Sequence, residues 1–199
     1  LINDGRSKWS KKLKKIIKIE ENGTKTFFYS ADISDYGKMK EIIDDIRSKQ
    51  GGINGIIHCA GVPGDGFLLR KDEDVFRSVL SPKVYGTWIL DDLTKNDKID
   101  FMIYCSSIAS VFGGFGQGDY AAANSYLDAY SIYRTRSGRR TISINWPAWE
   151  ETGMYAESTS KLKTVIQPLS VAKAVEVFDR ITGGDLPRII VGDVSGVNI

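Results

Sequence analysis

Apolar and polar positions alternate along this chain in blocks that have the spacing of helices and strands in turn. Apolar side chains three and four positions apart predict amphipathic helices, and short continuous apolar runs predict buried strands. The helices predicted in this way cover residues 8–21, 36–49, 72–94, 117–137 and 171–182. The predicted strands are Lys25–Ser30, Ile53–Cys59, Phe101–Cys105, Thr141–Asn145 and Arg188–Val191.

This order of elements predicts the fold class. Strands that alternate with helices form right-handed βαβ units and a mostly parallel sheet. The short strands are apolar almost throughout, as expected when helices cover both faces of a sheet. We therefore predict an α/β fold built on a doubly wound parallel sheet. Ligands of such sheets bind beyond the carboxyl ends of the strands, and glycines and polar residues gather just after Cys59, Cys105 and Asn145.

Composition and charge exclude several classes of protein. The chain has 199 residues, of which 42% are hydrophobic and 26% are charged, which is typical of one globular domain and not of a disordered chain. The net charge of +2 is too balanced to predict nucleic-acid binding. No apolar run is long enough to cross a membrane, and Leu1–Ser7 does not resemble a signal peptide. One histidine and two separate cysteines are too few for a zinc site and fit reduced thiols, so we expect a cytoplasmic protein without a metal.

The stretch from residue 104 to residue 124 carries the strongest chemical signal. A predicted strand ends in Ser106 and Ser107, and Tyr120 follows thirteen residues after Ser107, near the start of a predicted helix. Asn124 lies four residues further on and therefore shares a helix face with Tyr120. Each residue alone would fit a serine-rich loop with a half-buried tyrosine. Their joint placement at the ligand-binding edge of the sheet favours a catalytic site.

These residues, with further segments in the same order, resemble the short-chain dehydrogenase/reductase family and, more closely, the ketoreductase domains of modular polyketide synthases. Ordinary members of the wider family carry a lysine four residues after the tyrosine. This chain has Asn124 at that position and Lys83 upstream, which is similar to the polyketide ketoreductase arrangement. The resemblance implies a Rossmann-like fold. The further matching segments are Ser30–Asp35, Ile57–Val62, Ser81–Thr87, Asn124–Ala129, Asn145–Trp149 and Gly153–Met154.

The resemblance assigns catalytic roles to Lys83, Ser107, Tyr120 and Asn124. Tyr120 would donate a proton to the ketone oxygen, on which negative charge builds during hydride delivery, and Ser107 would hydrogen-bond that oxygen. A tyrosine pKa near 10 needs tuning for this task, and the ammonium of Lys83 is expected to lower it. Asn124 would orient Lys83 or a relay water. Without the family pattern, Lys83 would be interpreted as a solvated helix lysine.

The implied cofactor is NADPH. Arg6 matches the residue that pairs with the adenosine 2′-phosphate, which a guanidinium fork suits. Asp32, expected at a strand end, would bind the adenine amine, or would instead cap the helix that begins near Asp35. His58 is expected to be a packed strand residue and not a catalyst. The complete predicted set of cofactor-binding residues is Arg6, Asp32, Ile33, Ala60, Gly61, Lys83 and Tyr120.

The resemblance also indicates the substrate. Polyketide ketoreductases of one product class carry Leu-Asp-Asp after the Ala-Gly-Val segment, and here only the last aspartate, Asp65, is kept. Asp65 favours the class that forms the D-hydroxy product, while the other class often has a tryptophan where this chain has Phe112. Residues 150–169 are expected to form a lid over the substrate, with Gly153 as its hinge. The predicted substrate-binding residues are Asp65, Phe112, Gln117, Trp149 and Met154.

One feature of the family does not occur in the sequence. The glycine-rich turn between the first strand and the first helix, which holds the cofactor pyrophosphate, is missing. We therefore interpret residues 1–199 as a ketoreductase catalytic domain that lacks its first strand and helix, and we expect a companion segment or polypeptide to supply them. The predicted activity is NADPH-dependent reduction of a β-ketoacyl thioester on an acyl carrier protein, with no nucleic-acid or membrane partner. Two alternatives are a docking or structural remnant without activity, and a free-standing short-chain reductase, against which the Lys83–Asn124 exchange argues.

Overall fold

The computed structural model describes residues 8–64, 66–152 and 166–192. The chain forms two compact units, Leu1–Ala31 and Asp32–Ile199, which we describe separately. The first unit contains helix α1 (Lys8–Glu21), which has the predicted bounds. The second unit contains all the strands and the other helices of the described residues.

The predicted strand Lys25–Ser30 is wrong, because these residues belong to neither a helix nor a strand. Phe27 and Phe28, whose side chains were expected to be buried in a sheet, are 53% and 77% exposed. A strand exists only where its backbone groups pair with a neighbouring strand, and no described strand pairs with this segment. A run rich in aromatic residues predicts the tendency to form a strand but not the partner.

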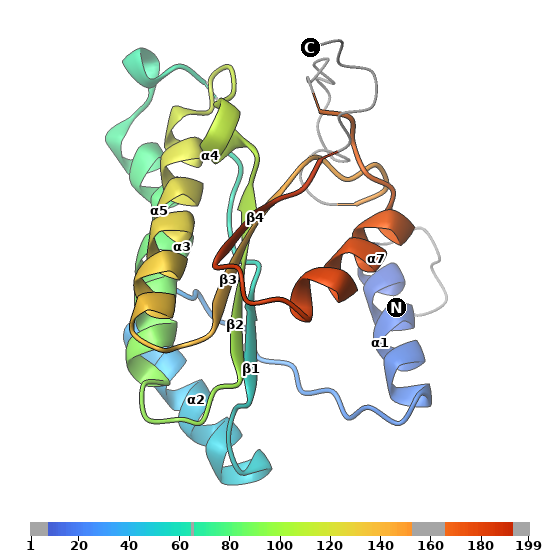
Figure 1. Cartoon of the computed structure of the whole chain (residues 1–199). Coiled ribbons are helices and arrows are strands. Elements are labelled where there is room, and N and C mark those ends of the chain that lie inside the picture. The colour runs from blue at the N-terminus through green and yellow to red at the C-terminus, as the bar shows by residue number, and fades with distance from the viewer. Residues whose placement is uncertain (1–7, 65, 153–165, 193–199) are drawn as a thin grey trace. The chain divides into compact units, whose positions relative to one another are not determined.

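The second unit is built on a four-stranded parallel sheet in the order β1-β2-β3-β4. Figure 1 shows α3 and α5 on one face of this sheet and α7 on the other, which confirms the predicted α/β fold. The strands are β1 (Gly55–His58), β2 (Phe101–Ser107), β3 (Thr141–Trp146) and β4 (Arg188–Ile190). The helices are α2 (Tyr36–Gln50), η1 (Leu68–Arg70), α3 (Glu73–Leu93), α4 (Ala109–Phe112), α5 (Gly118–Arg136) and α7 (Val171–Thr182).

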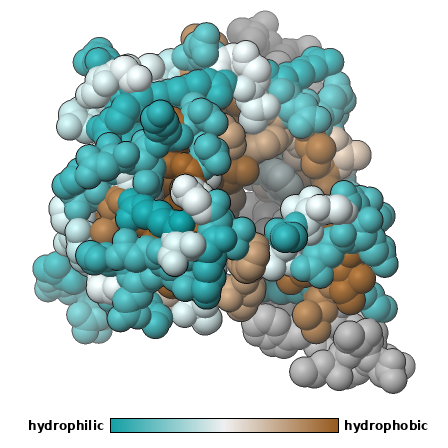
Figure 2. Space-filling view, turned by 90° about the horizontal axis from the view of Figure 1, so that it is seen from below, coloured by the Kyte–Doolittle hydropathy of each residue, from teal (hydrophilic) through white to brown (hydrophobic). Residues whose placement is uncertain are grey.

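The ends of the long helices follow from local chemistry. The side chains of Asp35, Asp72 and Ser170 each accept a backbone N–H in the first turn of α2, α3 and α7. Gly51 ends α2 with a φ of 82°, a conformation that favours glycine. Lysine–acidic ion pairs such as Lys40–Asp44 line α2. Hydrophilic residues cover much of the face of the molecule that Figure 2 shows.

Hydrophobic side chains pack on both faces of the sheet. Met102 and Tyr104 of β2 point to the same face and pack with Leu127 of α5, while Ile103 points to the opposite face and packs with α7. This alternation is what the period of two residues in a strand requires. The larger core, on the α7 face, consists of Ile103, Ile142, Ile144, Trp146, Leu169, Ala174, Ile181 and Val191.

Strand β1 differs from its prediction as a fully buried strand. It is one of the two edge strands of the described sheet, and Ile57 is 50% exposed because nothing described covers that position. His58, on the other face, is buried as expected, with Nε2 3.1 Å from the carbonyl oxygen of Pro82 in α3. Burial is the main cause that lowers the pKa of His58 to about 4, so the ring is neutral at neutral pH.

Among the described helices, none has the length and apolar character that would let it cross a bilayer.

Candidate active site

The candidate site lies at the carboxyl ends of the strands, as the fold predicts. Strand β2 ends at Ser107, the short helix α4 follows it, and α5 begins at Gly118. In Figure 1, α4 lies near the carboxyl end of the sheet together with η1. Neither of these short helices was predicted, because a single turn leaves too few positions to show a helical period.

The structure brings Ser107, Tyr120 and Asn124 together. The phenol of Tyr120 forms hydrogen bonds with the side chains of Ser107 and Asn124, and both bonds lower its pKa. The Asn124 amide nitrogen, Nδ2, also donates to the carbonyl oxygen of Tyr120 over 2.7 Å. The other amide atom, Oδ1, is buried and has no hydrogen-bond partner among the described residues. An unpartnered buried acceptor is costly, so this atom marks a place where a donor is to be expected.

The expected lowering of the Tyr120 pKa is wrong. Burial raises the pKa of Tyr120 above its ordinary value, and the hydrogen bonds with Ser107 and Asn124 only partly oppose that effect. The ammonium of Lys83 is not among the causes that act on it. In this structure, Tyr120 is therefore a phenol that keeps its proton at neutral pH.

Lys83 is buried in α3 and is only 4% exposed, so it is not a solvated lysine. Its Nζ donates to the carbonyl oxygen of Cys105 over 2.8 Å, two residues before Ser107. Burial lowers the pKa of Lys83 to about 8, because the charged form loses its hydration. The expected contact with Asn124 is not formed, since each of the two side chains hydrogen-bonds a backbone carbonyl instead.

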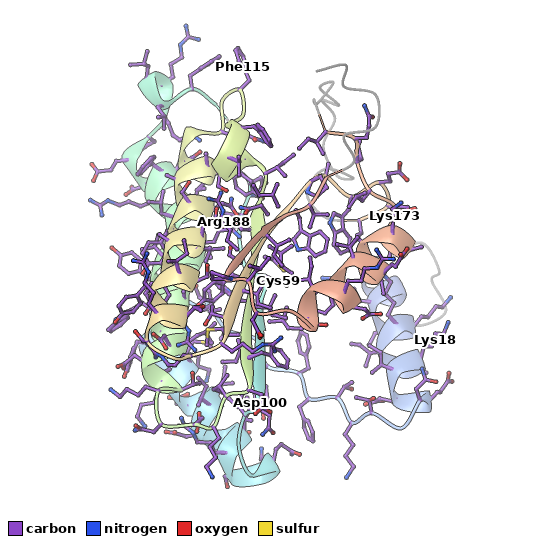
Figure 3. All side chains as sticks on the ribbon, viewed as in Figure 1. Lys18, Cys59, Asp100, Phe115, Lys173 and Arg188 are labelled. Carbon is purple, nitrogen blue, oxygen red and sulfur yellow. The ribbon has the colours of Figure 1, made fainter. Side chains whose placement is uncertain are left out.

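The two thiols of the chain lie side by side at this end of the sheet. Cys59 follows β1, Cys105 lies in β2, and their sulfur atoms are 3.0 Å apart. Both are free cysteines, as predicted. The hydrogen bond between them lowers the pKa of Cys59, the more exposed thiol, and Figure 3 labels this residue.

Asp128 anchors α5 to the sheet, a role that no pattern in the sequence indicated. Its Oδ1 accepts a hydrogen bond from Ser143 over 2.6 Å, and its Oδ2 accepts from Ser110 and Asn145 over 2.6 and 2.8 Å. Arg188 adds an ion pair of 3.1 Å to the same oxygen. The α5 face of β3 is therefore polar, and Ser143 and Asn145 are the exceptions to a strand that is otherwise largely apolar. This network fixes the helix that carries Tyr120 and Asn124.

The predicted cofactor residues are only partly assembled in the described structure. Asp32 lies at no strand end, because residues 25–30 form no strand; its Oδ1 accepts from the backbone N–H of Ser34 over 2.9 Å. Asp35, and not Asp32, caps α2. Ile33 packs on α3 at Gly86, where an added Cβ would lie 2.8 Å from its Cγ2. Ala60 and Gly61 directly follow β1, and Arg6 lies outside the described residues.

The predicted substrate residues are spread over both faces of the sheet. Phe112, at the end of α4, is 66% exposed. Gln117 directly precedes α5, and its side chain lies against Gly114. A Cβ added to that glycine would be only 2.2 Å from Oε1 of Gln117. Trp149 packs edge-to-face on Trp146, with ring centroids 5.2 Å apart, and so belongs to the α7 side. Asp65, Met154 and most of the predicted lid, including Gly153, lie outside the described residues.

The residues present fit a nicotinamide cofactor at one point. The unpartnered Oδ1 of Asn124 and the phenol of Tyr120 lie together, and Lys83 reaches the adjacent backbone of β2. Hydroxyl and ammonium donors at this edge suit a ribose and a carbonyl oxygen. Among the described residues, no strand–turn–helix with a glycine-rich turn supplies a pyrophosphate site.

Comparison with known proteins agrees with this geometry. The family model described as KR domain matches residues 1–151. The polyketide synthase PksN of Bacillus subtilis (strain 168) is 34% identical over 206 residues, and the match covers 97% of this chain and 4% of PksN. PksM of the same organism is 38% identical over 156 residues, which cover 77% of this chain and 4% of PksM. The chain thus spans a small part of the relatives that it matches.

Solved structures give the same result. A ketoreductase domain from the bacillaene assembly line superimposes with a TM-score of 0.86 and 32% identity, and the match covers 95% of this chain and 48% of that one. An N-terminal ketoreductase from the macrolactin assembly line gives a TM-score of 0.82 and 30% identity, with coverages of 96% and 39%.

Proposed function

Because the chain belongs to the KR domain family, the ketoreductase domains of polyketide synthases, we propose that it reduces a β-ketoacyl thioester on an acyl carrier protein with NADPH. The cluster of Ser107, Tyr120 and Asn124 is the observation that carries this proposal. A protonated, buried phenol beside a serine hydroxyl is what a ketone oxygen needs as it gains negative charge.

NADPH, when bound, supplies the hydride that reduces the ketone carbon. The Ser107 hydroxyl donates a hydrogen bond to the ketone oxygen and orients it. The Tyr120 phenol, kept protonated by burial, gives its proton to the same oxygen as the C–H bond forms, and the hydroxyl product results. The phenolate is then reprotonated from solvent through a relay water that Asn124 would orient, and Lys83, whose lowered pKa is about 8, is a group that can exchange a proton with solvent near neutral pH.

The remaining residues of the cofactor site follow from the family resemblance. Lys83 and Tyr120 hold the nicotinamide ribose, and Ala60 and Gly61 let the backbone approach the cofactor. Asp32 and Ile33 contact the adenine, for which the exposure of Asp32 is favourable. Arg6 pairs with the 2′-phosphate, which would select NADPH over NADH.

We further propose that a companion segment supplies a strand that pairs with β1 and a glycine-rich turn for the pyrophosphate. Two observations support it: β1 is an edge strand of the described sheet, and its residue Ile57 is half exposed. An unpaired apolar strand edge invites the addition of another strand. We call this chain together with such a segment, on the same or on another polypeptide, the complemented enzyme.

We also propose the stereochemistry of the product and the residues that surround the acyl chain. Asp65 favours the D-hydroxy product, and residues 150–169 act as the lid, with Phe112, Gln117, Trp149 and Met154 around the acyl chain. Reduction of a defined β-ketoacyl thioester, followed by chiral chromatography of the hydroxy product, tests the stereochemistry. A predominantly L product would contradict it.

A single substitution tests the activity itself. The complemented enzyme should oxidise NADPH when given a β-ketoacyl thioester, and Tyr120→Phe should slow this reaction by roughly two to four orders of magnitude, the usual contribution of a general acid. Tyr126→Phe is the matched control, because Tyr126 lies in the same helix and was assigned no role in the reaction. An inactive wild type that still binds NADPH would favour the docking or structural remnant instead. Preference for small free ketones over the thioester would favour the free-standing reductase.

A further inference from the structure

Two segments that border the active site are packed together. One segment, residues 66–71, follows the loop after β1, and the other, residues 115–119, leads into α5. Phe67 and Phe115 meet edge-to-face with ring centroids 4.8 Å apart. A Cβ on Gly118 would lie 2.8 Å from Leu68, so the two chains touch there as well. Phe115 is labelled in Figure 3, where it lies at the same end of the molecule as α4.

A buried ion pair lies at one end of the contact between these two segments. The Lys71 ammonium lies 2.5 Å from Oδ2 of Asp119, and the side chains are only 3% and 0% exposed. The described residues place Gly64 directly over the same carboxylate, where a Cβ would lie 2.3 Å from Oδ1. Burial of two charges is costly unless their geometry is good and their remaining atoms are hydrogen-bonded. Such a pair therefore fixes the positions of both segments.

Asp119 connects this pair to the reacting group. Its Oδ1 accepts a hydrogen bond from the backbone N–H of Tyr120 over 2.8 Å. That N–H lies in the first turn of α5, where N–H groups have no partner within the helix. A negative charge there also complements the positive end of the helix. One carboxylate thus holds the backbone of Tyr120 with one oxygen and Lys71 with the other.

We propose that Asp119 is a positioning residue for Tyr120, held in place by Lys71, and that the pair couples segment 66–71 to the start of α5. The proposal rests on the function proposed above, because it assigns the proton donor to Tyr120. Lys71 neutralises the carboxylate, which lets Asp119 sit buried beside the phenol-bearing residue. Oδ1 of Asp119 then sets the position of the Tyr120 backbone, and with it the direction of the phenol.

Variants can separate the charge from the hydrogen bond. Lys71→Met and Asp119→Asn each leave one buried charge without its partner, and each should lower the melting temperature by roughly 10 °C. The double variant Lys71→Met/Asp119→Asn removes both charges but keeps an oxygen acceptor for the Tyr120 N–H. Lys71→Met/Asp119→Leu removes both charges and the acceptor. Both double variants should recover most of the melting temperature.

The two double variants should then differ in catalysis. In the complemented enzyme, kcat of the Asn form should stay within about threefold of the wild type, whereas kcat of the Leu form should fall roughly 10- to 100-fold at unchanged KM for NADPH, as expected for a misplaced catalytic group. The exposed pair Arg77–Glu73 is the matched control, and Arg77→Gln/Glu73→Gln should change neither quantity. Equal kcat values for the Asn and Leu forms would overturn the proposal.

A readout that does not need activity distinguishes this proposal from the proposed function. Fluorotyrosine placed at position 120 should give a ¹⁹F resonance that is shifted from free fluorotyrosine in the wild type and in the Asn form. The resonance should move toward the free position, or broaden, in the Leu form. If no ketone is reduced but these shifts occur, the proposed function fails and the positioning role stands. The same resonance in both double variants would refute the role of Asp119 whatever the activity.

Discussion

The side chain of Asn124 donates to the carbonyl oxygen of Tyr120, one turn earlier in α5, over 2.7 Å, and its own Oδ1 stays buried without a partner among the described residues. The amide is therefore tied to the helix by its nitrogen, while its oxygen remains a buried acceptor without a donor among the described residues.

Replacement of Asn124 by Leu should reduce activity more than stability. The change removes an acceptor that has no partner, so the free energy of unfolding should fall by no more than about 1–2 kcal/mol, mainly through the lost bond to the Tyr120 carbonyl. The rate of ketone reduction should fall roughly 10- to 100-fold, because the relay that returns the proton to Tyr120 loses a member. Stopped-flow NADPH oxidation and urea unfolding measure the two effects. Ser125→Ala, next in the helix but exposed, is the control, and equal activity of Asn124→Leu and wild type would exclude a catalytic role.

Lys83 should make the stability of the chain change with pH in the alkaline range. Its pKa is about 8 in the folded chain and about 10.5 when exposed. Between these values the unfolded chain binds more protons than the folded chain, so stability rises with pH across this window. Lys83→Met should remove that rise. Below pH 8 the variant should be more stable than the wild type by up to about 3 kcal/mol, less about 1 kcal/mol for the lost bond to Cys105.

Urea unfolding at pH 7, 9 and 10.5 tests this expectation. The difference between Lys83→Met and wild type should shrink as the pH rises. Lys95→Met is a suitable control, because Lys95 lies on the surface in an exposed ion pair with Asp92 and should show little such window. A difference that stays constant from pH 7 to 10.5 would show that Lys83 is not desolvated.

Thr87 offers a stabilising substitution. Its side chain is fully buried in α3, and its hydroxyl has no hydrogen-bond partner among the described residues. Thr87→Val keeps the shape and removes an unpaired polar group, so it should raise the free energy of unfolding by about 1 kcal/mol. Thr141 is the matched contrast: it is equally buried, but its hydroxyl accepts from Arg134 and donates to the carbonyl of Arg139. Thr141→Val should therefore destabilise the chain, and the same sign of change for both variants would contradict this argument.

The helices and inner strands could be predicted from the sequence, because their signals are local. Asp35, Asp72 and Ser170 stand where helices α2, α3 and α7 begin, and the predicted range of α7 agrees with the structure at both ends. The strand Lys25–Ser30 could not be judged in the same way, because a strand depends on a partner that is remote in the sequence. The burial of β1 was overestimated for the same reason, because it too depends on residues that are remote in the sequence.

The candidate site, too, has features that could be predicted from the sequence and features that could not. The spacing of Ser107, Tyr120 and Asn124 survives in three dimensions because a strand, a loop and a helix of fixed geometry carry it. The opposite shift of the Tyr120 pKa could not be predicted, since burial depends on how α5 packs. Lys71 and Asp119 are 48 residues apart, and no periodicity connects them. Asp119 directly precedes Tyr120, and this adjacency was the one available hint.

Asp128 should be costly to change although it is not one of the reacting groups. It is 3% exposed and holds Ser143, Ser110, Asn145 and Arg188 together at the α5 face of β3. Asp128→Asn would turn an amide N–H₂ toward groups that now donate to a carboxylate, and it would leave the Arg188 guanidinium without this counter-charge.

We expect Asp128→Asn to lower the free energy of unfolding by about 3 kcal/mol, measured by urea unfolding at neutral pH. Asp185→Asn is the control, because Asp185 is 96% exposed beside Arg140 and should contribute little. Arg188→Met in the Asp128→Asn background should recover part of the loss, since it removes the unpaired charge. If Asp128→Asn unfolds at the same urea concentration as the wild type, the network does not hold α5 on the sheet, and another contact must fix the helix that carries Tyr120.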